Sequence, residues 1–214
     1  RPNTQRYFKF NDGSEMRVHF SPTDDGEHRA ILPFIHSAKP GDTMRISMFG
    51  SGGLEAVRAL QRAQSRGVII KMVLDNVTGS GNYSWIKHKQ GNLFDPNPYP
   101  LVMGDVATVV PMDIRLNGWP GLNHHKTATI TRPDGRVVQM IIGSQNWSQQ
   151  GNNENDENMV TIRRLNGSIP AGEAFNKQFD ESMLPLSYVL EKAEDGSGLR
   201  KRPIQGVQGL SENR

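Results

Sequence analysis

Short apolar runs alternate with helical patterns early in the chain, and this alternation constrains the fold more than any other feature. Residues 68–74 form an apolar run rich in β-branched residues, which is typical of a strand buried on both faces. Residues 53–67 carry apolar side chains at helical spacing, and residues 43–49 form another strand-like run. A strand at residues 16–20 and a helix at residues 27–38 are expected before them. This order predicts an α/β fold with a mostly parallel mixed central sheet flanked by helices.

The rest of the sequence predicts a long insertion followed by further strands. Residues 76–123 lose periodicity and are rich in Gly, Pro and Asn, with a helix expected near residues 83–89 and a strand near residues 106–110. The elements expected after the insertion are strands at residues 125–131, 137–142 and 158–164 and a helix at residues 171–183. We therefore expect one domain over residues 1–183 and a polar tail or linker over residues 184–214.

Composition limits the chemistry more than it identifies it. The 25 basic and 22 acidic residues give a net charge of +3, which is only a weak indication of an anionic partner. Without cysteine there is no disulfide, no thiolate nucleophile and no Cys-containing zinc site. The histidines other than His124 and His125 lack ligand spacing, so we expect no metal and no other cofactor. Because the sequence starts at Arg1, a removed secretion signal stays open, and a secreted or periplasmic location is favoured.

Two short polar motifs lie at the ends of expected strands. Side chains at positions i and i+2 of a strand face the same way, so His124 would share a side with Lys126, and Ser144 with Asn146. A hairpin through the turn at residues 132–136 would bring the two motifs together. Lysine, hydroxyl and amide groups can bind phosphate oxygens while a histidine attacks phosphorus. The four side chains therefore predict a site that binds a phosphate and attacks its phosphorus.

The sequences HHK at residues 124–126 and GSQN at residues 143–146 resemble the HxK…GSxN pattern of the phospholipase D superfamily. Further landmarks extend the resemblance over roughly residues 16–183. The resemblance implies an α/β sandwich in which two HxK halves meet across a pseudo-two-fold axis. It also implies that one histidine forms a phosphohistidine intermediate while the other acts as general acid and then base. No metal is required by that chemistry.

One further residue and one departure follow from the resemblance. Glu157 matches the glutamate that orients the histidine in this superfamily, so His124 and Glu157 are the expected pair. Many members carry an aspartate five residues after the lysine, where this chain has Thr131, and Asp134 in the following turn is a candidate replacement. We expect this departure to affect local geometry rather than catalysis.

The motif occurs once, whereas the family's site uses two. The second half is expected from a homodimer partner or from another half of a longer or divided protein. Phospholipid head-group hydrolysis or transfer, with peripheral membrane contact, is the preferred activity because apolar residues precede His124 and the net charge is modest. The alternative is metal-independent cleavage of DNA or RNA, favoured by a single motif in a short basic chain. A member that only binds phosphodiesters is disfavoured because the predicted catalytic and phosphate-binding residues are intact.

Overall fold

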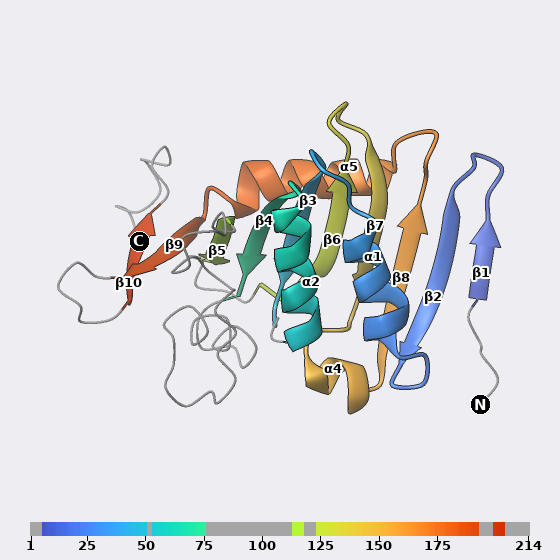
Figure 1. Cartoon of the computed structure of the whole chain (residues 1–214), viewed down its shortest axis with the longest axis horizontal. Coiled ribbons are helices and arrows are strands. Elements are labelled where there is room, and N and C mark those ends of the chain that lie inside the picture. Colours follow the sequence, from blue (N-terminus) through green and yellow to red (C-terminus); the bar gives the residue numbers. More distant parts are fainter. Residues whose placement is uncertain (1–5, 51–52, 76–112, 118–122, 193–198, 204–214) are drawn as a thin grey trace.

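One mixed sheet of ten strands runs through the centre of the chain (Figure 1). The computed structural model describes residues 6–50, 53–75, 113–117, 123–192 and 199–203. The strands are β1 (Arg6–Lys9), β2 (Glu15–Ser21), β3 (Thr43–Met48), β4 (Ile69–Leu74), β5 (Asp113–Asn117), β6 (Lys126–Thr131), β7 (Val137–Gly143), β8 (Glu157–Arg163), β9 (Ser187–Lys192) and β10 (Leu199–Pro203). Their order in the sheet is β1-β2-β8-β7-β6-β3-β4-β5-β9-β10.

Helices cover both faces of this sheet, which confirms the predicted α/β class. The helical segments are η1 (Glu27–Ile31), α1 (Leu32–His36), α2 (Leu54–Ser65), α4 (Gln149–Asn153), α5 (Pro170–Gln178) and η2 (Phe179–Met183). Helices α1 and α2 lie on one face, α5 lies on the other, and α4 lies at one end of the strands (Figure 1). The larger apolar core forms under α1 and α2 and includes Leu60, Met72 and Trp147, while Phe175 and Phe179 belong to the smaller core under α5. Removal of these side chains from water stabilises the layered arrangement.

The prediction of a mostly parallel sheet is wrong. Among the described strands, only the pairs β3–β4 and β4–β5 are parallel, and the other neighbouring pairs are antiparallel. The unit β3–α2–β4 keeps its strands parallel because a helix carries the chain back across the sheet. A tight turn joins β6 to β7 instead, with Gly135 at φ 89° and a hydrogen bond of 2.9 Å from Arg132 N to Arg136 O. Strands joined by such a short turn can only pair in opposite directions.

The expected elements between residues 16 and 74 and between residues 125 and 183 appear with small shifts at their ends. Strands β1 and β5 and helix α4 were not expected. The helix expected near residues 83–89 and the strand expected near 106–110 lie outside the described residues. Residues 184–214, expected to be a tail or linker, contain β9, which pairs with β5, and β10, which pairs with β9. Strands β9 and β10 therefore extend the sheet.

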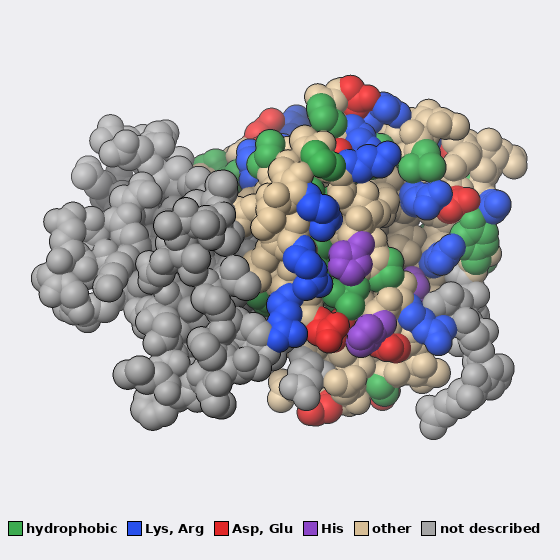
Figure 2. Space-filling model, in the orientation of Figure 1, with side chains coloured by type: hydrophobic (Ala, Val, Ile, Leu, Met, Phe, Trp, Pro, Cys, Tyr) green, Lys and Arg blue, Asp and Glu red, His purple; other side chains and the backbone are tan. Residues whose placement is uncertain are grey.

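The two faces of the sheet differ in how far they are covered. The smaller core under α5 includes Val137 and Met140 of β7, near the hairpin that joins β6 to β7. Towards the other end of the strands, Phe20 and Ile142 remain 43% and 40% exposed. Both alternate with residues packed under α1 and α2, so they face the side of α5. On the opposite side of the molecule, the outer surface of α1 and α2 displays mainly Lys, Arg and His side chains (Figure 2).

Candidate active site

The predicted site residues gather at one end of the sheet. Strand β6 begins with Lys126 opposite Met48, the last residue of β3. On the other side, β7 ends at Gly143 opposite Met159, near the start of β8. The HHK and GSQN motifs thus lie at the same end of neighbouring antiparallel strands, as the hairpin prediction required. We call this the site end, and the opposite end the hairpin end.

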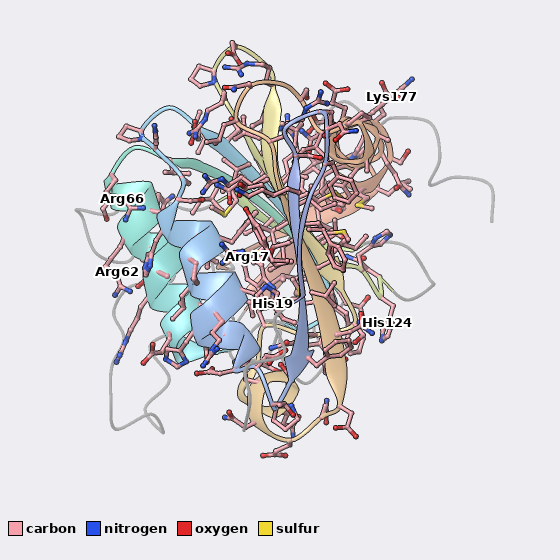
Figure 3. All side chains as sticks on the ribbon, turned by 90° about the vertical axis from the view of Figure 1, so that its right-hand side faces the viewer. Arg17, His19, Arg62, Arg66, His124 and Lys177 are labelled. Carbon is pink, nitrogen blue, oxygen red and sulfur yellow. The ribbon has the colours of Figure 1, made fainter. Side chains whose placement is uncertain are left out.

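His124 lies immediately before β6 rather than within it, so strand alternation does not by itself orient its ring. The imidazole is exposed and packs against Phe49, with ring centroids 4.9 Å apart and an interplanar angle of 56°. Figure 3 places His124 towards the site end, on the side of the sheet away from α1 and α2. An exposed imidazole held by an aromatic neighbour is open to a substrate at this edge.

Lys126 is almost fully buried and lies beside His124. Its ammonium donates to the carbonyl oxygen of His124 at 3.1 Å and lies 5.0 Å from the centre of the Phe49 ring. Burial lowers the pKa of Lys126, while the negative charges of Glu157 and Asp75 act in the opposite direction. No carboxylate of the described residues forms an ion pair with this ammonium. Its charge is therefore available to an anion at the site end.

The GSQN segment is held by backbone contacts that leave donors free. Ser144 N donates to Asn158 O at 2.9 Å, and Ser144 Oγ accepts from Asn158 N at 3.0 Å, so the hydroxyl proton is still able to donate. A Cβ on Gly143 would overlap the carbonyl oxygen of Asn158, so the close approach of the two backbones at this position requires glycine. Asn146 Oδ1 accepts from Gly50 N at 3.1 Å, and its Nδ2 has no acceptor among the described residues. This segment thus keeps two side-chain donors at the site end.

The predicted pair of His124 and Glu157 makes no direct hydrogen bond in the described structure. Glu157 begins β8 opposite Ser21 and accepts from Asn155 Nδ2 at 3.2 Å. Its charge acts on Lys126, as the pKa of that lysine reflects. The carboxylate is therefore near the site but is not hydrogen-bonded to the histidine ring.

His125, expected to face away from His124, is also exposed. Partial burial and the charge of Lys126 lower the pKa of its ring. Its backbone is held on both sides, because its carbonyl accepts from Phe49 N at 2.9 Å and its N–H donates to Asn123 Oδ1 at 3.4 Å. These contacts position the peptide between His124 and Lys126.

Several residues that support the site were given no role in it from the sequence. Asp75, directly after β4, accepts from Asn123 N at 2.9 Å, and Ser47 Oγ donates to Asn123 Oδ1 at 3.2 Å. Asp75 could have been predicted as a site residue because it is a polar residue directly after a buried strand. Trp147 is fully buried and packs edge-on against Phe34, with centroids 6.4 Å apart, which anchors the chain after Asn146.

The residues that replace the family's aspartate lie far from the site. Thr131 is at the hairpin end of β6, where it accepts from Asn176 Nδ2 at 2.9 Å. Asp134 lies in the exposed turn and pairs with Arg136 at 2.7 Å. Thr131 therefore connects β6 to α5, and neither residue reaches His124.

Two broader searches of the described residues concern other kinds of site. No group of three or more His, Asp or Glu side chains among them is arranged to hold a metal ion. No helix in the described part of the chain combines the length and apolar character needed to cross a bilayer.

Known proteins share this architecture. A family model described as "Cardiolipin synthase, PLD-like domain" matches residues 31–183. The solved structure of Nuc, a phospholipase D family member from Salmonella typhimurium, aligns with a TM-score of 0.57 and 20% identity, over 89% of this chain and 99% of that chain. NucT from Helicobacter pylori aligns with a TM-score of 0.56 and 16% identity, over 81% of this chain and 98% of that chain.

A larger enzyme also shares the fold. Phosphatidylserine synthase from Haemophilus influenzae aligns with a TM-score of 0.51 and 11% identity, over 87% of this chain but 41% of that chain. The chain has no significant match among curated protein sequences. The family match spans well over half of the chain and includes both polar motifs. This chain therefore belongs to the phospholipase D superfamily of phosphodiesterases.

Proposed function

We propose that the chain cleaves phosphodiesters through a phosphohistidine formed at His124. One observation carries the proposal: the exposed imidazole of His124 and the buried ammonium of Lys126 both pack against the Phe49 ring, and this ammonium has no ion pair with a carboxylate of the described residues. In the first step, a nitrogen of His124 forms a bond to phosphorus, and the bond from phosphorus to the leaving oxygen breaks as that oxygen takes a proton from the second histidine. Water, deprotonated by that histidine, then attacks phosphorus and releases His124.

The other site residues bind and stabilise the phosphate. Lys126 supplies positive charge to the non-bridging oxygens, and Ser144 Oγ and Asn146 Nδ2 supply hydrogen bonds. Burial makes the ammonium costly in the free chain, and an arriving phosphate adds a favourable charge to those of Glu157 and Asp75. Glu157 is assigned to orient His124, which requires the imidazole to turn towards the start of β8.

The second histidine is assigned to a second half-site, from another copy of this chain or from another half of a longer protein. The apolar face beside the site supports this assignment. Phe20 and Ile142 expose large apolar areas there, and Phe8 on β1, facing the same side, is 42% exposed. Exposed apolar patches of this kind mark protein interfaces. A partner that covered this face would bring its own residues to the edge where His124 lies.

The preferred substrate is a phospholipid, with release or transfer of its head group. Support comes from the description of the matching family as a cardiolipin synthase domain and from the shared fold of phosphatidylserine synthase. The family description and the name of the solved enzyme both refer to phospholipid synthesis. A substrate of this class would bring the site end into contact with a membrane surface.

Cleavage of DNA or RNA is the second candidate, and the charge on the outer surface of α1 and α2 favours it. The exposed basic residues on or next to these helices include Arg29, Lys39, Arg62 and Arg66. Figure 2 shows a band of Lys and Arg side chains over this part of the molecule. Arg62 and Arg66 contribute to a lowered pKa at His36, after the larger effect of burial. Such a surface attracts polyanions, and binding through it would weaken as salt is added.

The test is turnover in EDTA, with phosphatidylcholine vesicles and plasmid DNA as parallel substrates. We expect the wild-type chain to release choline and a folded His124→Asn variant to release none. His125→Asn is the matched control, because it removes a neighbouring exposed histidine and should keep turnover. Cut plasmid without released choline would favour the nuclease. Equal turnover by wild type and His124→Asn would contradict the assignment of His124.

A further inference from the structure

A line of buried polar side chains connects the phosphate-binding segment to the start of α2. Ser21 Oγ donates to Gln145 Oε1 at 2.6 Å, and Gln145 Nε2 donates to Asn152 Oδ1. Asn152 Nδ2 in turn donates to Glu27 Oε2 at 2.7 Å. Gln145 and Asn152 are 1% and 2% exposed. Buried amides need fixed partners, since each unpaired group would lose its hydrogen bonds to water.

Glu27 ends this line at a position where its carboxylate has a second role. Helix α2 begins after Gly53, which provides no side-chain cap. The carboxylate of Glu27 accepts a hydrogen bond from the backbone N–H of Ala56, in the first turn of α2. Helix starts carry free N–H groups and partial positive charge, so an acceptor there is stabilising. Glu27 thus joins a helix start to the buried amides.

Gln145 lies between the two residues assigned to the phosphate. Its side chain points into the protein, whereas Ser144 and Asn146 contact the backbone of Asn158 and Gly50 at the site end. A change in the position of Gln145 would therefore move both neighbours. The fit around this segment is tight, because a Cβ on Gly26 would overlap Gln145 Oε1.

We propose that Glu27 is a positioning residue: through Asn152 and Gln145, its carboxylate fixes Ser144 and Asn146 for binding of a substrate phosphate. The expected effect on turnover rests on the proposed function. The positioning of Ser144 and Asn146 does not, because it can be observed in the chain without substrate. Ordered supporting contacts of this kind decide whether binding groups are held in productive geometry.

Acid should weaken this arrangement. Burial raises the pKa of Glu27, with smaller raising contributions from Glu55 and Asp25 and opposing ones from His28 and from the backbone hydrogen bond of Ala56. Glu55, Asp25 and His28 are the titratable groups that face it from α2, the preceding loop and η1. A raised pKa means that the carboxylate takes up a proton at a higher pH than an ordinary glutamate does. As pH falls, protonation therefore weakens the acceptance from Asn152 and Ala56, because the neutral carboxyl loses its negative charge and one of its two oxygens becomes a donor.

NMR of the free chain tests the positioning without any need for activity. We expect Glu27→Gln to shift the backbone amide of Ser144 and the side-chain amide of Asn146, with the rest of the fold retained. Glu55→Gln, which alters an exposed acid at the same end of α2, should leave both signals in place. Acidification should move the two signals in wild type and in Glu55→Gln but much less in Glu27→Gln. Unmoved signals in folded Glu27→Gln, at all pH values, would overturn the proposal.

Turnover separates this inference from the proposed function. If the wild-type chain is active, Glu27→Gln and Gln145→Leu should lower kcat/KM by on the order of tenfold, as expected for a small displacement of binding groups. A wild-type chain without activity, combined with shifted Ser144 and Asn146 signals in Glu27→Gln, would sink the proposed function and leave the positioning role intact. Shifted Ser144 and Asn146 signals in a Glu27→Gln variant with full activity would show that the positioning by Glu27 does not matter for substrate binding, which would overturn that part of the proposal.

Discussion

The two ends of β6 and β7 use their charged residues differently. At the hairpin end, Arg132 pairs with the buried carboxylate of Asp42, and Arg136 pairs with Asp134. At the site end, the buried ammonium of Lys126 contacts only a carbonyl oxygen and an aromatic ring among the described residues. The same strands therefore end in ion pairs on one side and, on the other, in a cation that forms no ion pair with the described residues. Charge that is left without a partner is charge available to a ligand.

Replacement of Lys126 should give the largest effect on activity. We expect Lys126→Ala to lower kcat/KM by about a thousandfold, because loss of one group that stabilises transition-state charge costs roughly a hundred- to a thousandfold. Stability should not fall in proportion, since burial of that ammonium is itself unfavourable. The measurements are steady-state kinetics and urea unfolding on the same preparation. Retained activity in Lys126→Ala would contradict the claim that the charge at the site end serves activity rather than stability.

Replacement of Arg132 should give the reverse pattern. Asp42 is 1% exposed, so Arg132→Met leaves a buried carboxylate without its cation. We expect a loss of about 3 kcal/mol in the free energy of unfolding, as for other broken buried pairs. The kcat/KM of the folded variant should stay near the wild-type value at a temperature where it remains folded. A large fall in kcat/KM without a fall in stability would contradict the assignment of this end to stability.

Exposed apolar residues at the two ends provide a matched pair for the partner surface. Phe20 faces the open side of the sheet near the site end, and Leu165, 49% exposed, follows β8 at the hairpin end. If a second copy covers the site end, Phe20→Asp should weaken self-association by about tenfold or more, as at other interface anchors. Leu165→Asp should leave it unchanged. Sedimentation velocity over a concentration series measures both, and equal behaviour of the two variants would contradict this surface.

The smallest effect is expected from His19, which is buried in β2 near the site end. Burial lowers the pKa of its ring, and Nδ1 has no hydrogen-bond partner among the described residues. The His19 ring therefore binds a proton more readily in the unfolded chain than in the folded one. His19 thus lowers the free energy of unfolding as pH falls below its unfolded pKa of about 6.5. The loss continues down to the lowered folded pKa. Urea unfolding between these limits should show a shallower pH slope for His19→Gln than for wild type, and parallel slopes would refute the prediction.

Local patterns in the sequence predicted much of the fold. The helical spacing before residues 68–74 correctly indicated the crossover unit β3–α2–β4, whose strands are parallel. The antiparallel pairing of β2 with β8 joins segments far apart in the chain, and spacing along the sequence contains no information about it. The mostly parallel sheet was inferred by extending the pattern of one unit to the whole chain.

For the candidate site, as for the fold, the sequence predicted local features but not the contacts between segments far apart in the chain. The HHK and GSQN motifs flank two strands that pair through a hairpin, so the sequence indicated that both motifs would lie at the same end of the sheet. Supporting contacts such as Ser21 to Gln145 and Asp75 to Asn123 cross long stretches of sequence and depend on packing of the loops. The pairing of His124 with Glu157 stays a prediction, since the described structure contains no hydrogen bond between the two side chains.

Trapping of the covalent intermediate tests the central claim most directly. The wild-type chain would be quenched rapidly during turnover of the substrate it accepts, kept alkaline, digested and mapped by mass spectrometry. We predict phosphate, or the phosphate-bearing part of the substrate, on the ring of His124, with His125 unmodified and no adduct at position 124 in His124→Asn. An adduct on His125 or on another residue, or turnover by His124→Asn at the wild-type rate, would contradict the account.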